Sequence, residues 1–572
     1  MIPADMRLHE SVRRRAGLIV LGLLAVAAAT LSARSQDRQV ATGVEEVRQL
    51  NQGGKSADAE RRARELLVDS ERQFGPESLE TASVLDVLAE SLQQGGKSRD
   101  PEALPSAERA LRIKESRLGP DHKDVAVSLM ALAAIQMNTG RYVESQSALR
   151  RALTIREKTL GPDHVLTATT LGSFATVTSE FLGETEVARP LLDRARAATE
   201  KAYGPDHVAL GRVLFNSARN AFRRDDPASA REFLQRALAI FQKQYGLEHA
   251  LTGNTLESLA MAEQRLGNYD AAQTRFEQSI PILEKVGGPD HEWVANAVND
   301  YGLLLWQLGD YPRARTSYQR ALDIWTAKKS SQTGAALNNL AILARRTGDY
   351  VEARGFYERS IAIKEAAFGP NHAEVAIAVH NLGNLLADIG DYAGSRRLFE
   401  RAIAIRVEKL GPSHSLVASS RYGLAETLMN SGRTVEAYRE FDAALTIWRK
   451  NAPESPDVAI GLRGLAGFFE KRRQLIRADE HYTEALALYE RLYGGDHLEV
   501  GSVLNSLSAV AARRGQVARA RGLSERALVI LQKTLGGGTQ QIAQALALQA
   551  DLDLRSREWS PCLLYTSPSP RD

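Results

Sequence analysis

The chain has 572 residues, of which 44% are hydrophobic and 25% are charged. This length exceeds one compact core, so we expect three or four domains or one elongated array. Lys and Arg number 73 against 70 Asp and Glu, which leaves a net charge of +3 and argues against a strongly basic nucleic-acid-binding protein. The single cysteine excludes an intramolecular disulfide, a multi-cysteine zinc site and an iron–sulfur cluster.

The N-terminal segment has the pattern of an export signal. Four arginines lie within residues 7–15, and an apolar run covers residues 16–29 with a weaker extension to residue 33. This pattern indicates that residues 1–33 are a signal peptide or a signal anchor, and a buried N-terminal helix is the alternative. Because the basic residues stay in the cytoplasm, we expect an exported protein that is periplasmic or anchored in the inner membrane through residues 16–33. Residues 34–42 would be a linker.

A five-residue string of the form Leu-Gly-Pro-Asp-His recurs along most of the chain. Its histidines are His122, His164, His207, His249, His291, His372, His414 and His497. The steps between them are 42, 43, 42, 42, 81, 42 and 83 residues. The two double steps each contain a degenerate copy, at residues 329–334 and 452–457. The chain is therefore organised by an internal repeat of about 42 residues.

Two helices are predicted between successive corners. Residues 125–137 and 145–158 each place apolar side chains at helical spacing, and a Gly-x-Tyr turn at residues 140–142 separates them. The corner glycine supplies a left-handed residue at the helix end, and the proline after it cannot continue the helix. Each unit is thus helix, turn, helix and corner. The turn has decayed at residues 183–185, 224–227 and 474–476, and residues 98–105 lengthen the second unit.

These features resemble a known family. The Leu-Ala pair of the first helix, the Gly-x-Tyr turn and the Arg-Ala-Leu-x-Ile string of the second helix, as in Arg151–Ile155, look like tetratricopeptide repeats. The period and the corner resemble the kinesin light chain type. The resemblance implies an all-α fold, an α-solenoid over residues 43–559 in which about twelve helix pairs form a right-handed superhelix. The first helices would line a concave groove suited to an extended peptide or protein.

The C-terminal residues depart from the repeat. The last unit begins normally at residues 542–554, but three prolines follow within residues 561–572, where a second helix is due. The string resembles the translation of a sequencing adapter, so we expect that residues 560–572 are not native and that the last repeat is truncated. A native disordered tail rich in Pro and Ser is the alternative.

Most residues that suggest chemistry have a structural interpretation. The corner histidines lie one per repeat, too far apart to share a metal ion, so we expect them to cap helices. Residues 54–56 and 96–98 mimic the end of a phosphate-binding loop, but Gln49 and Ser91 stand where the loop needs glycine. We expect no catalytic residue, no cofactor and no metal ion.

The predicted groove is the candidate binding site. In the family motif an Asn before the Leu-Ala pair holds the backbone of a bound peptide, and arginines near that face suit carboxylates. The candidate amides and their neighbours are Asn216, Asn299, Asn338, Asn339, His380, Asn381 and Asn384, and the candidate cations are Arg219, Arg223, Arg265, Arg345 and Arg346. The alternatives are that the amides make contacts within the array and that the arginines are solvated.

The sequence thus favours a non-catalytic scaffold that binds a protein or an extended, acidic peptide, and no nucleic acid. The alternative is the sensing portion of a larger enzyme or signalling protein, such as a CHAT-type peptidase or a kinase, whose effector domain is missing from this chain. A purely structural spacer is a third reading. The sequence does not identify the partner.

Overall fold

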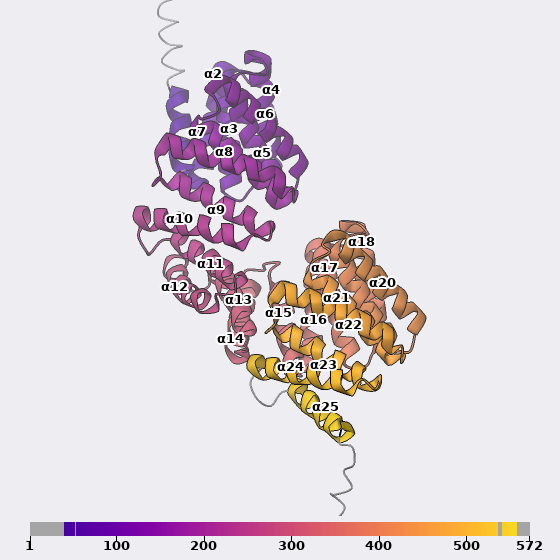
Figure 1. Ribbon diagram of the computed structural model, residues 1–572. Helices are drawn as coiled ribbons and strands as arrows, with labels where there is room; N and C mark the ends of the chain where they lie inside the picture. Colours follow the sequence, from indigo (N-terminus) through magenta and orange to yellow (C-terminus); the bar gives the residue numbers. More distant parts are fainter. Residues whose placement is uncertain (1–38, 52, 536–539, 557–572) are drawn as a thin grey trace, which may run out of the picture. The chain divides into compact units, whose positions relative to one another are not determined.

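The computed structural model describes residues 39–51, 53–535 and 540–556 (Figure 1). All regular structure in these ranges is helical, which confirms the all-α prediction. None of the helices in the described ranges is long and apolar enough to cross a membrane. The predicted signal and its span, residues 1–33, and the predicted adapter translation, residues 560–572, lie outside the described residues.

The chain divides between Ala297 and Val298 into two compact units, and the division falls within one helix. The first unit contains a helical segment at residues 39–51, then α2 (Ser56–Phe74), α3 (Leu79–Gln94), α4 (Ala103–Leu118), α5 (Lys123–Asn138), α6 (Tyr142–Leu160), α7 (Val165–Thr176), α8 (Thr185–Tyr203), α9 (Val208–Arg223), α10 (Pro227–Tyr245), α11 (Ala250–Arg265), α12 (Tyr269–Gly287) and the start of α13 (Glu292–Gln307).

The second unit continues the same alternation of first and second helices. It contains the rest of α13, then α14 (Tyr311–Ala327), α15 (Thr333–Thr347), α16 (Tyr350–Phe368), α17 (Ala373–Asp388), α18 (Tyr392–Leu410), α19 (Ser415–Asn430), α20 (Thr434–Asn451), α21 (Pro456–Lys471), α22 (Leu475–Tyr493), α23 (Leu498–Arg513), α24 (Val517–Leu535) and α25 (Gln540–Ser556). Both degenerate corners, residues 329–334 and 452–457, begin in the connection between two helices, and the last two residues of each lie in the first turn of the next helix.

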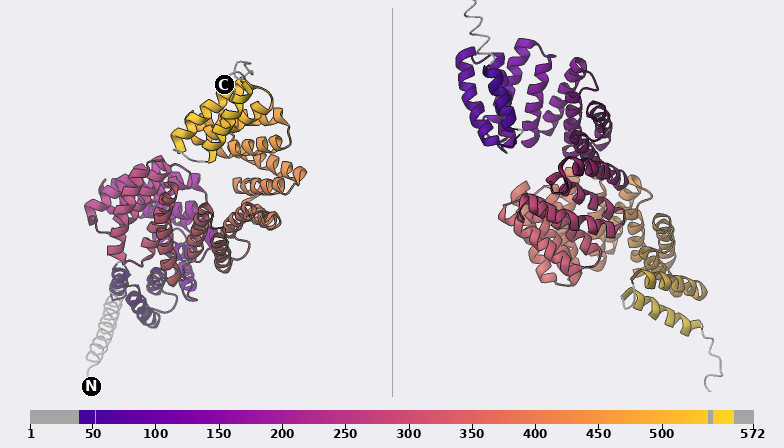
Figure 2. Two further views of the ribbon diagram at one scale, coloured as in Figure 1. Left: turned by 90° about the horizontal axis from the view of Figure 1, so that it is seen from below. Right: turned by 90° about the vertical axis from the view of Figure 1, so that its left-hand side faces the viewer.

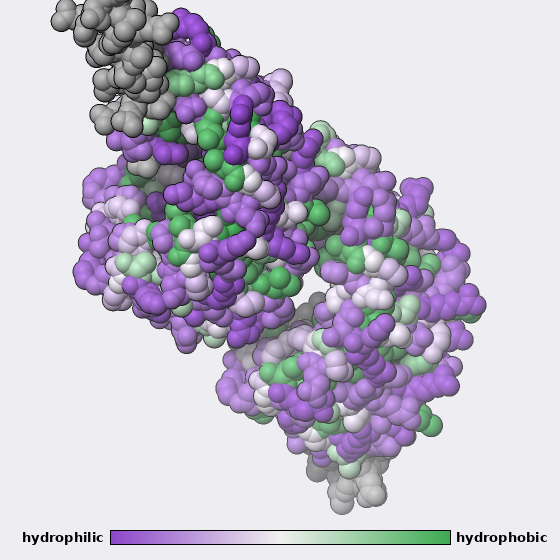
Figure 3. Space-filling model, turned by 90° about the horizontal axis from the view of Figure 1, so that it is seen from above, coloured by the Kyte–Doolittle hydropathy of each residue, from purple (hydrophilic) through white to green (hydrophobic). Residues whose placement is uncertain are grey.

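Consecutive helices pack on one another from α2 to α12 and from α14 to α25, so that helix pairs stack side by side within each unit (Figure 2). The core is a row of small clusters, because one amphipathic helix pair buries its apolar face only against the next pair. A large aromatic side chain at the eighth position of many second helices fills each junction. Examples are Phe276, Tyr357, Phe399 and Phe441, all fully buried. On the face drawn in Figure 3, hydrophilic residues prevail and hydrophobic ones form small separate groups.

The corner histidines cap the first helices, as predicted. In each of the eight corners the imidazole Nδ1 accepts a hydrogen bond from the backbone N–H two residues later, at 3.1–3.3 Å. This bond satisfies one of the N–H groups that a helix start leaves unpaired. In four corners the ring also stacks on an aromatic residue of the preceding helix, as His207 does on Tyr203 at 4.2 Å between ring centroids.

The corner aspartate has a role that the sequence pattern did not reveal. Its carboxylate pairs with a lysine in the last turn of the next second helix, as in the 2.8 Å contact between Asp121 and Lys158 and the 2.6 Å contact between Asp496 and Lys533. A second series joins neighbouring second helices, as in the 3.1 Å pair of Arg236 and Glu200. Each such exposed pair contributes little by itself, about 0–1 kcal/mol, so the apolar junctions hold the array together.

Two departures from the repeat have a structural explanation. The step of 43 residues between His164 and His207 contains one residue more than its neighbours, and a π-helical turn at Val177–Phe181 absorbs it. The insertion at residues 98–105 lengthens the connection between α3 and α4, which runs from residue 95 to residue 102.

One boundary requires correction. Residues 39–42, assigned to the linker at residues 34–42, are already helical. Val40, Val44 and Val47 lie at helical spacing and pack into the first core cluster. Their burial extends the helix toward the N-terminus, because a helix that buries such a stripe is stabilised by its packing.

Candidate binding groove and family membership

The first helices lie along the inner face of each unit. In the first unit α3 contacts α5 and α7 contacts α9, and in the second unit α15, α17, α19 and α21 contact one another in succession. Contacts between successive second helices are weaker than these. Neighbouring first helices are therefore closer together than second helices, which places them on the concave side of each unit, as the resemblance implied.

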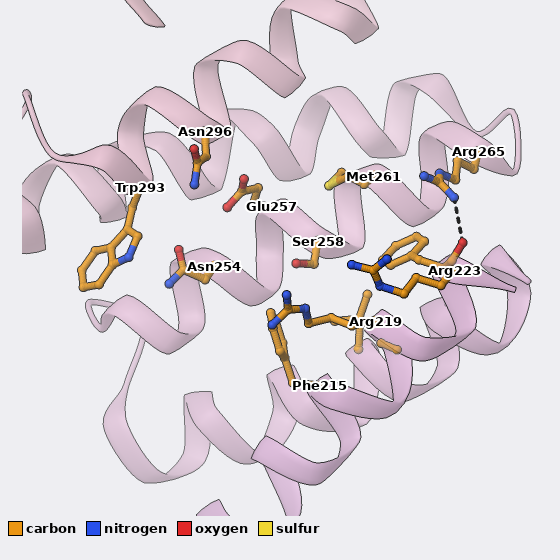
Figure 4. Close-up of a pocket in the computed structure, with 13 residues that line it drawn as sticks. Phe215, Arg219, Arg223, Asn254, Glu257, Ser258, Met261, Arg265, Trp293 and Asn296 are labelled. Atoms are coloured by element: carbon orange, nitrogen blue, oxygen red, sulfur yellow. Dashed lines mark hydrogen bonds between the residues drawn. The ribbon is translucent and has the colours of Figure 1, made fainter. Parts of the chain in front are cut away.

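A pocket of about 610 Å³ opens on this side of the first unit, between α9, α11 and the start of α13 (Figure 4). Arg219 and Arg223 project from α9 toward α11, and Arg265 lies at the end of α11. Three of the five predicted cations thus line one pocket. Arg345 and Arg346 belong to the second unit and line no part of it.

The π-helical turn supplies the carboxylate that pairs with Arg219. Glu180 lies in this turn, and its Oε2 is 2.7 Å from Arg219 Nη2. The carboxylate is 10% exposed, whereas the guanidinium is 48% exposed. Burial raises the pKa of Glu180, and the charges of Arg219 and Arg223 act in the opposite direction. The extra residue therefore places an acidic side chain against the arginines of the pocket.

The other two arginines differ in their partners. Arg265 stacks over Phe222 at 5.1 Å from the ring centroid and donates a hydrogen bond to the Phe222 carbonyl oxygen at 3.2 Å. Arg223 is exposed and forms no ion pair or hydrogen bond within the ranges that the structure describes. Its guanidinium is therefore the donor in the pocket most available to an anionic group.

Apolar and amide groups that the sequence pattern did not predict complete the lining of the pocket. Phe215 from α9, Met261 from α11 and Trp293 from α13 supply apolar surface, and Asn254 and Asn296 supply amides (Figure 4). The two asparagines lie four residues before the position at which the family motif has Asn. One helical turn separates these positions, so a search at that spacing could have found them.

The predicted asparagines of the second unit bond mainly to one another. Asn339 Nδ2 donates to Asn299 Oδ1 at 2.9 Å, and Asn381 Nδ2 donates to Asn338 Oδ1 at 3.0 Å. The pairs join α13 to α15 and α15 to α17. Asn338 is only 8% exposed, so the prediction that it contacts a peptide needs correction: it lies in the helix interface. These bonds favour the alternative that the amides act within the array.

The remaining candidates are half-buried or already paired. His380 Nδ1 lies 3.3 Å from Ser420 Oγ, and burial lowers the pKa of His380 to about 3. Arg345 Nε contacts Asp388 Oδ2 at 2.5 Å, and Arg346 Nε donates to the Tyr311 hydroxyl at 3.3 Å. Asn216 and Asn384 are half-buried, and neither lines the pocket.

Neither a metal site nor a catalytic cluster was predicted, and in the described ranges no three His, Cys, Asp or Glu residues are placed to hold a metal ion. His481 is half-buried, and its ring stacks on Phe469 at 5.4 Å between ring centroids.

Comparison with solved structures gives partial likenesses. A kinesin light chain repeat protein from Podosopora anserina is 25% identical, with a TM-score of 0.33, and the match covers 37% of this chain and 97% of that one. BtubC (BKLC) from P. vanneervenii is 20% identical, with a TM-score of 0.33, over 43% and 91%. A Rap protein complexed with competence and sporulation factor is 15% identical, with a TM-score of 0.45, over 73% and 99%. Among curated proteins, none matches the chain.

A profile of the tetratricopeptide repeat matches most of the chain. The matched segments are residues 124–181, 179–243, 251–327, 332–408, 416–490 and 457–533. They cover most of the helices from α5 to α24 and five of the capped corners, those of His164, His207, His291, His372 and His497. The chain therefore belongs to the tetratricopeptide repeat family, and its 42-residue repeats with their Gly-Pro-Asp-His corners are of the kinesin light chain type.

Proposed function

We propose that this protein is a non-catalytic scaffold that binds an extended, acidic peptide segment of a partner protein on the concave side of its repeats. The observation that carries the proposal is the pocket at α9, α11 and α13, in which Arg219, Arg223 and Arg265 converge. Guanidinium groups donate paired hydrogen bonds to carboxylates, and a pocket that excludes part of the water strengthens such contacts.

The rest of the lining suits a peptide main chain and its apolar side chains. Asn254 and Asn296 each offer a donor and an acceptor, so one amide can hold both groups of an extended backbone. Phe215 and Trp293 provide aromatic surface that an apolar side chain can cover. The pocket thus combines charge for affinity and amides for orientation.

Glu180 gives this site an internal competitor. Its carboxylate occupies Arg219 in the free protein, as a carboxylate of the peptide would in the complex. An incoming acidic side chain therefore engages Arg223 first and exchanges with Glu180 at Arg219. We expect this exchange to reduce, without abolishing, the preference for acidic over neutral peptides, because the internal pair has to be broken.

We also propose that the repeats act outside the cytoplasm, in the periplasm or anchored to the inner membrane. The basic residues and the apolar run of residues 1–33 support this proposal. A fusion of alkaline phosphatase after residue 60 tests it, because this enzyme is active only after export. Activity that survives deletion of residues 16–33 would contradict the proposal.

The groove is tested with the double variant Arg219→Gln with Arg223→Gln. Binding of a fluorescein-labelled decapeptide of alternating Asp and Leu is measured by anisotropy, together with a version that carries Asn in place of Asp. We expect the variant to weaken binding of the acidic peptide roughly tenfold or more and to leave the neutral peptide nearly unchanged.

The matched control removes two other cations of the same unit, Lys201→Gln with Lys243→Gln. Both lysines pair with corner aspartates at exposed positions, so their loss changes the net charge equally and the stability little. If both double variants weaken binding equally, net charge and not the pocket determines affinity, and the groove assignment is wrong.

A further inference from the structure

A second hollow lies in the other unit, on helices that the proposed groove does not use. It has a volume of about 340 Å³ and is formed by the start of α20, the end of α21 and the start of α22. Its residues come from the turn side of the repeats, where the first helix passes into the second. One of the decayed turns, residues 474–476, borders it.

The floor of this hollow, which we call the turn-edge cleft, is aromatic. Phe468 and Phe469 lie at its base, 5.4 Å apart between ring centroids, and both are 5% exposed. Tyr438 adds a third ring, 5.8 Å from Phe468. Val435 and Ile476 extend the apolar surface outward and are 67% and 64% exposed. Apolar side chains that are exposed next to an apolar hollow indicate an interaction surface, because removing them from water lowers the free energy.

The rim of the turn-edge cleft is cationic. Arg439, Arg472 and Arg477 line it and are exposed, and Arg473 follows directly in the turn. Arg477 lies over the Phe469 ring at 5.3 Å. Within the ranges that the structure describes, none of the four pairs with a carboxylate, and no acidic residue lines the cleft. Like charges gathered without a counter-charge repel one another, so an anionic partner relieves this repulsion.

Arg473 strengthens the case because its position is unfavourable for any residue with a side chain. Its φ is 58°, in the left-handed region, whereas ten turns between the paired helices have glycine at this point. Among the described turns between paired helices, Asp225, with a φ of 55°, is the one other residue at this point that is not glycine. Glycine adopts this conformation without strain, so arginine here adds a charge at the expense of local stability.

We propose that the turn-edge cleft docks an acidic peptide segment of a partner protein, with one large apolar side chain seated on Phe468 and Phe469 and flanking carboxylates on Arg472 and Arg477. Charge complementarity selects this occupant, because every charged residue that lines the cleft is an arginine and the floor is aromatic. The inference goes beyond the proposed groove, from which it differs in helices, in lining and in compact unit.

The test uses the full chain and a fluorescein-labelled peptide, Gly-Ser-Asp-Glu-Phe-Glu-Asp-Ser-Gly. Two comparison peptides replace Phe by Gly, or the acidic residues by their amides. We expect Arg472→Gln with Arg477→Gln to weaken binding of the first peptide about tenfold or more, as judged by anisotropy. Both comparison peptides should bind the parent protein at least about tenfold more weakly than the first.

The matched control is Arg449→Gln with Arg526→Gln, which removes two exposed cations of the same unit that pair with Glu484 and Glu490. It should change the affinity less than about twofold. A further variant, Val435→Glu, places a carboxylate at the exposed edge of the cleft and should abolish binding without disturbing the fold. Equal affinity in parent and cleft variants would overturn the proposal, and so would equal binding of the Phe and Gly peptides.

A photoreactive version of the peptide, with benzoylphenylalanine in place of Phe, separates this proposal from the groove. We expect cross-links within residues 434–477 that persist in Arg219→Gln with Arg223→Gln. Cross-links confined to α9, α11 and α13 would overturn the cleft and support the groove. Absence of cross-links both within residues 434–477 and within α9, α11 and α13 of the parent protein would overturn the cleft and the groove alike. A membrane is the alternative partner of this surface. It would be supported, and the peptide proposal overturned, if the parent protein binds none of the peptides but sediments with phosphatidylserine vesicles, and if Arg472→Gln with Arg477→Gln abolishes the sedimentation.

Discussion

Replacement of a corner histidine tests how the repeats are held in register. His207 accepts the Ala209 N–H through Nδ1 at 3.2 Å, and its ring stacks on Tyr203 at 4.2 Å with 12° between the planes. His164 makes an equivalent cap with Leu166 at 3.2 Å, but Leu160 stands where an aromatic partner would be. The two corners therefore differ in one contact.

The magnitudes follow from these contacts. Loss of an N-cap costs about 1 kcal/mol, and loss of a stacked ring pair costs about 0.5–1.5 kcal/mol more. We therefore expect His207→Ala to destabilise α9 by about 2 kcal/mol, and His164→Ala to destabilise α7 by about 1 kcal/mol. His207→Asn restores the cap without the ring, so it should cost about 1 kcal/mol.

The assay has to be local, because a repeat array opens in parts and a single unfolding transition would not isolate one corner. Amide hydrogen exchange over residues 207–215 reports α9 directly. A loss of 2 kcal/mol corresponds to roughly thirtyfold faster exchange, and a loss of 1 kcal/mol corresponds to roughly fivefold. Equal exchange in the Ala and Asn variants would refute the capping role. Equal effects at His164 and His207 would refute the contribution of the stacked ring.

Three further predictions concern the interior of the array. Burial lowers the pKa of His380 to about 3, so on acidification the unfolded state binds the proton first, and the free energy of unfolding falls below pH 6.5. The variant His380→Asn should remove on the order of 2 kcal/mol of the stability loss between pH 7 and 5. Urea unfolding at the two pH values would show this as a smaller shift of the midpoint. Gly423→Ala would place a Cβ 2.5 Å from a buried phenylalanine ring and should lower the stability by about 1–3 kcal/mol. Gly172→Ala meets no atom within 4 Å and should raise the stability by up to about 1 kcal/mol. Thermal melting measures both changes. Lys114→Met leaves the buried carboxylate of Asp86 unpaired and should lower the stability by about 3–5 kcal/mol. Addition of Asp86→Leu to this variant should restore most of the loss, as measured by urea unfolding. No recovery in the double variant would contradict the pairing of Lys114 with Asp86.

The architecture is predictable from the sequence because the signals that determine it are local and repeated. The corner histidines marked the period, and the left-handed glycines marked helix ends, so most helices lie where they were predicted. The histidine cap follows from the same logic, because a side-chain acceptor before a helix meets a free N–H group wherever it occurs. Because the same local signals occur in each repeat, the copies support one another, and the assignment of helices and turns becomes unambiguous.

The site was less predictable, because it depends on which side chains are already occupied. In sequence, Asn299 and Asn339 are indistinguishable from asparagines that bind a peptide. Only the 2.9 Å hydrogen bond from Asn339 to Asn299 shows that the two amides bind one another. Likewise, Arg223 and Arg345 look alike in sequence, yet Arg345 meets Asp388 at 2.5 Å and Arg223 has no such partner in the described ranges. Partners that lie about 40 residues apart are set by the stacking of repeats.

By itself, the sequence determined the helices, their caps and the 42-residue repeat, and it identified a tetratricopeptide array. Only the tertiary structure decided where the pocket opens, and that an extra residue becomes a π-helical turn carrying Glu180. It also decided that three arginines, which have no carboxylate partner within the described ranges, line an aromatic cleft at α20, α21 and α22. The physical reason is range. Helix formation and capping depend on neighbours within one turn, whereas a binding surface depends on which charges and apolar groups remain uncovered after successive repeats have packed.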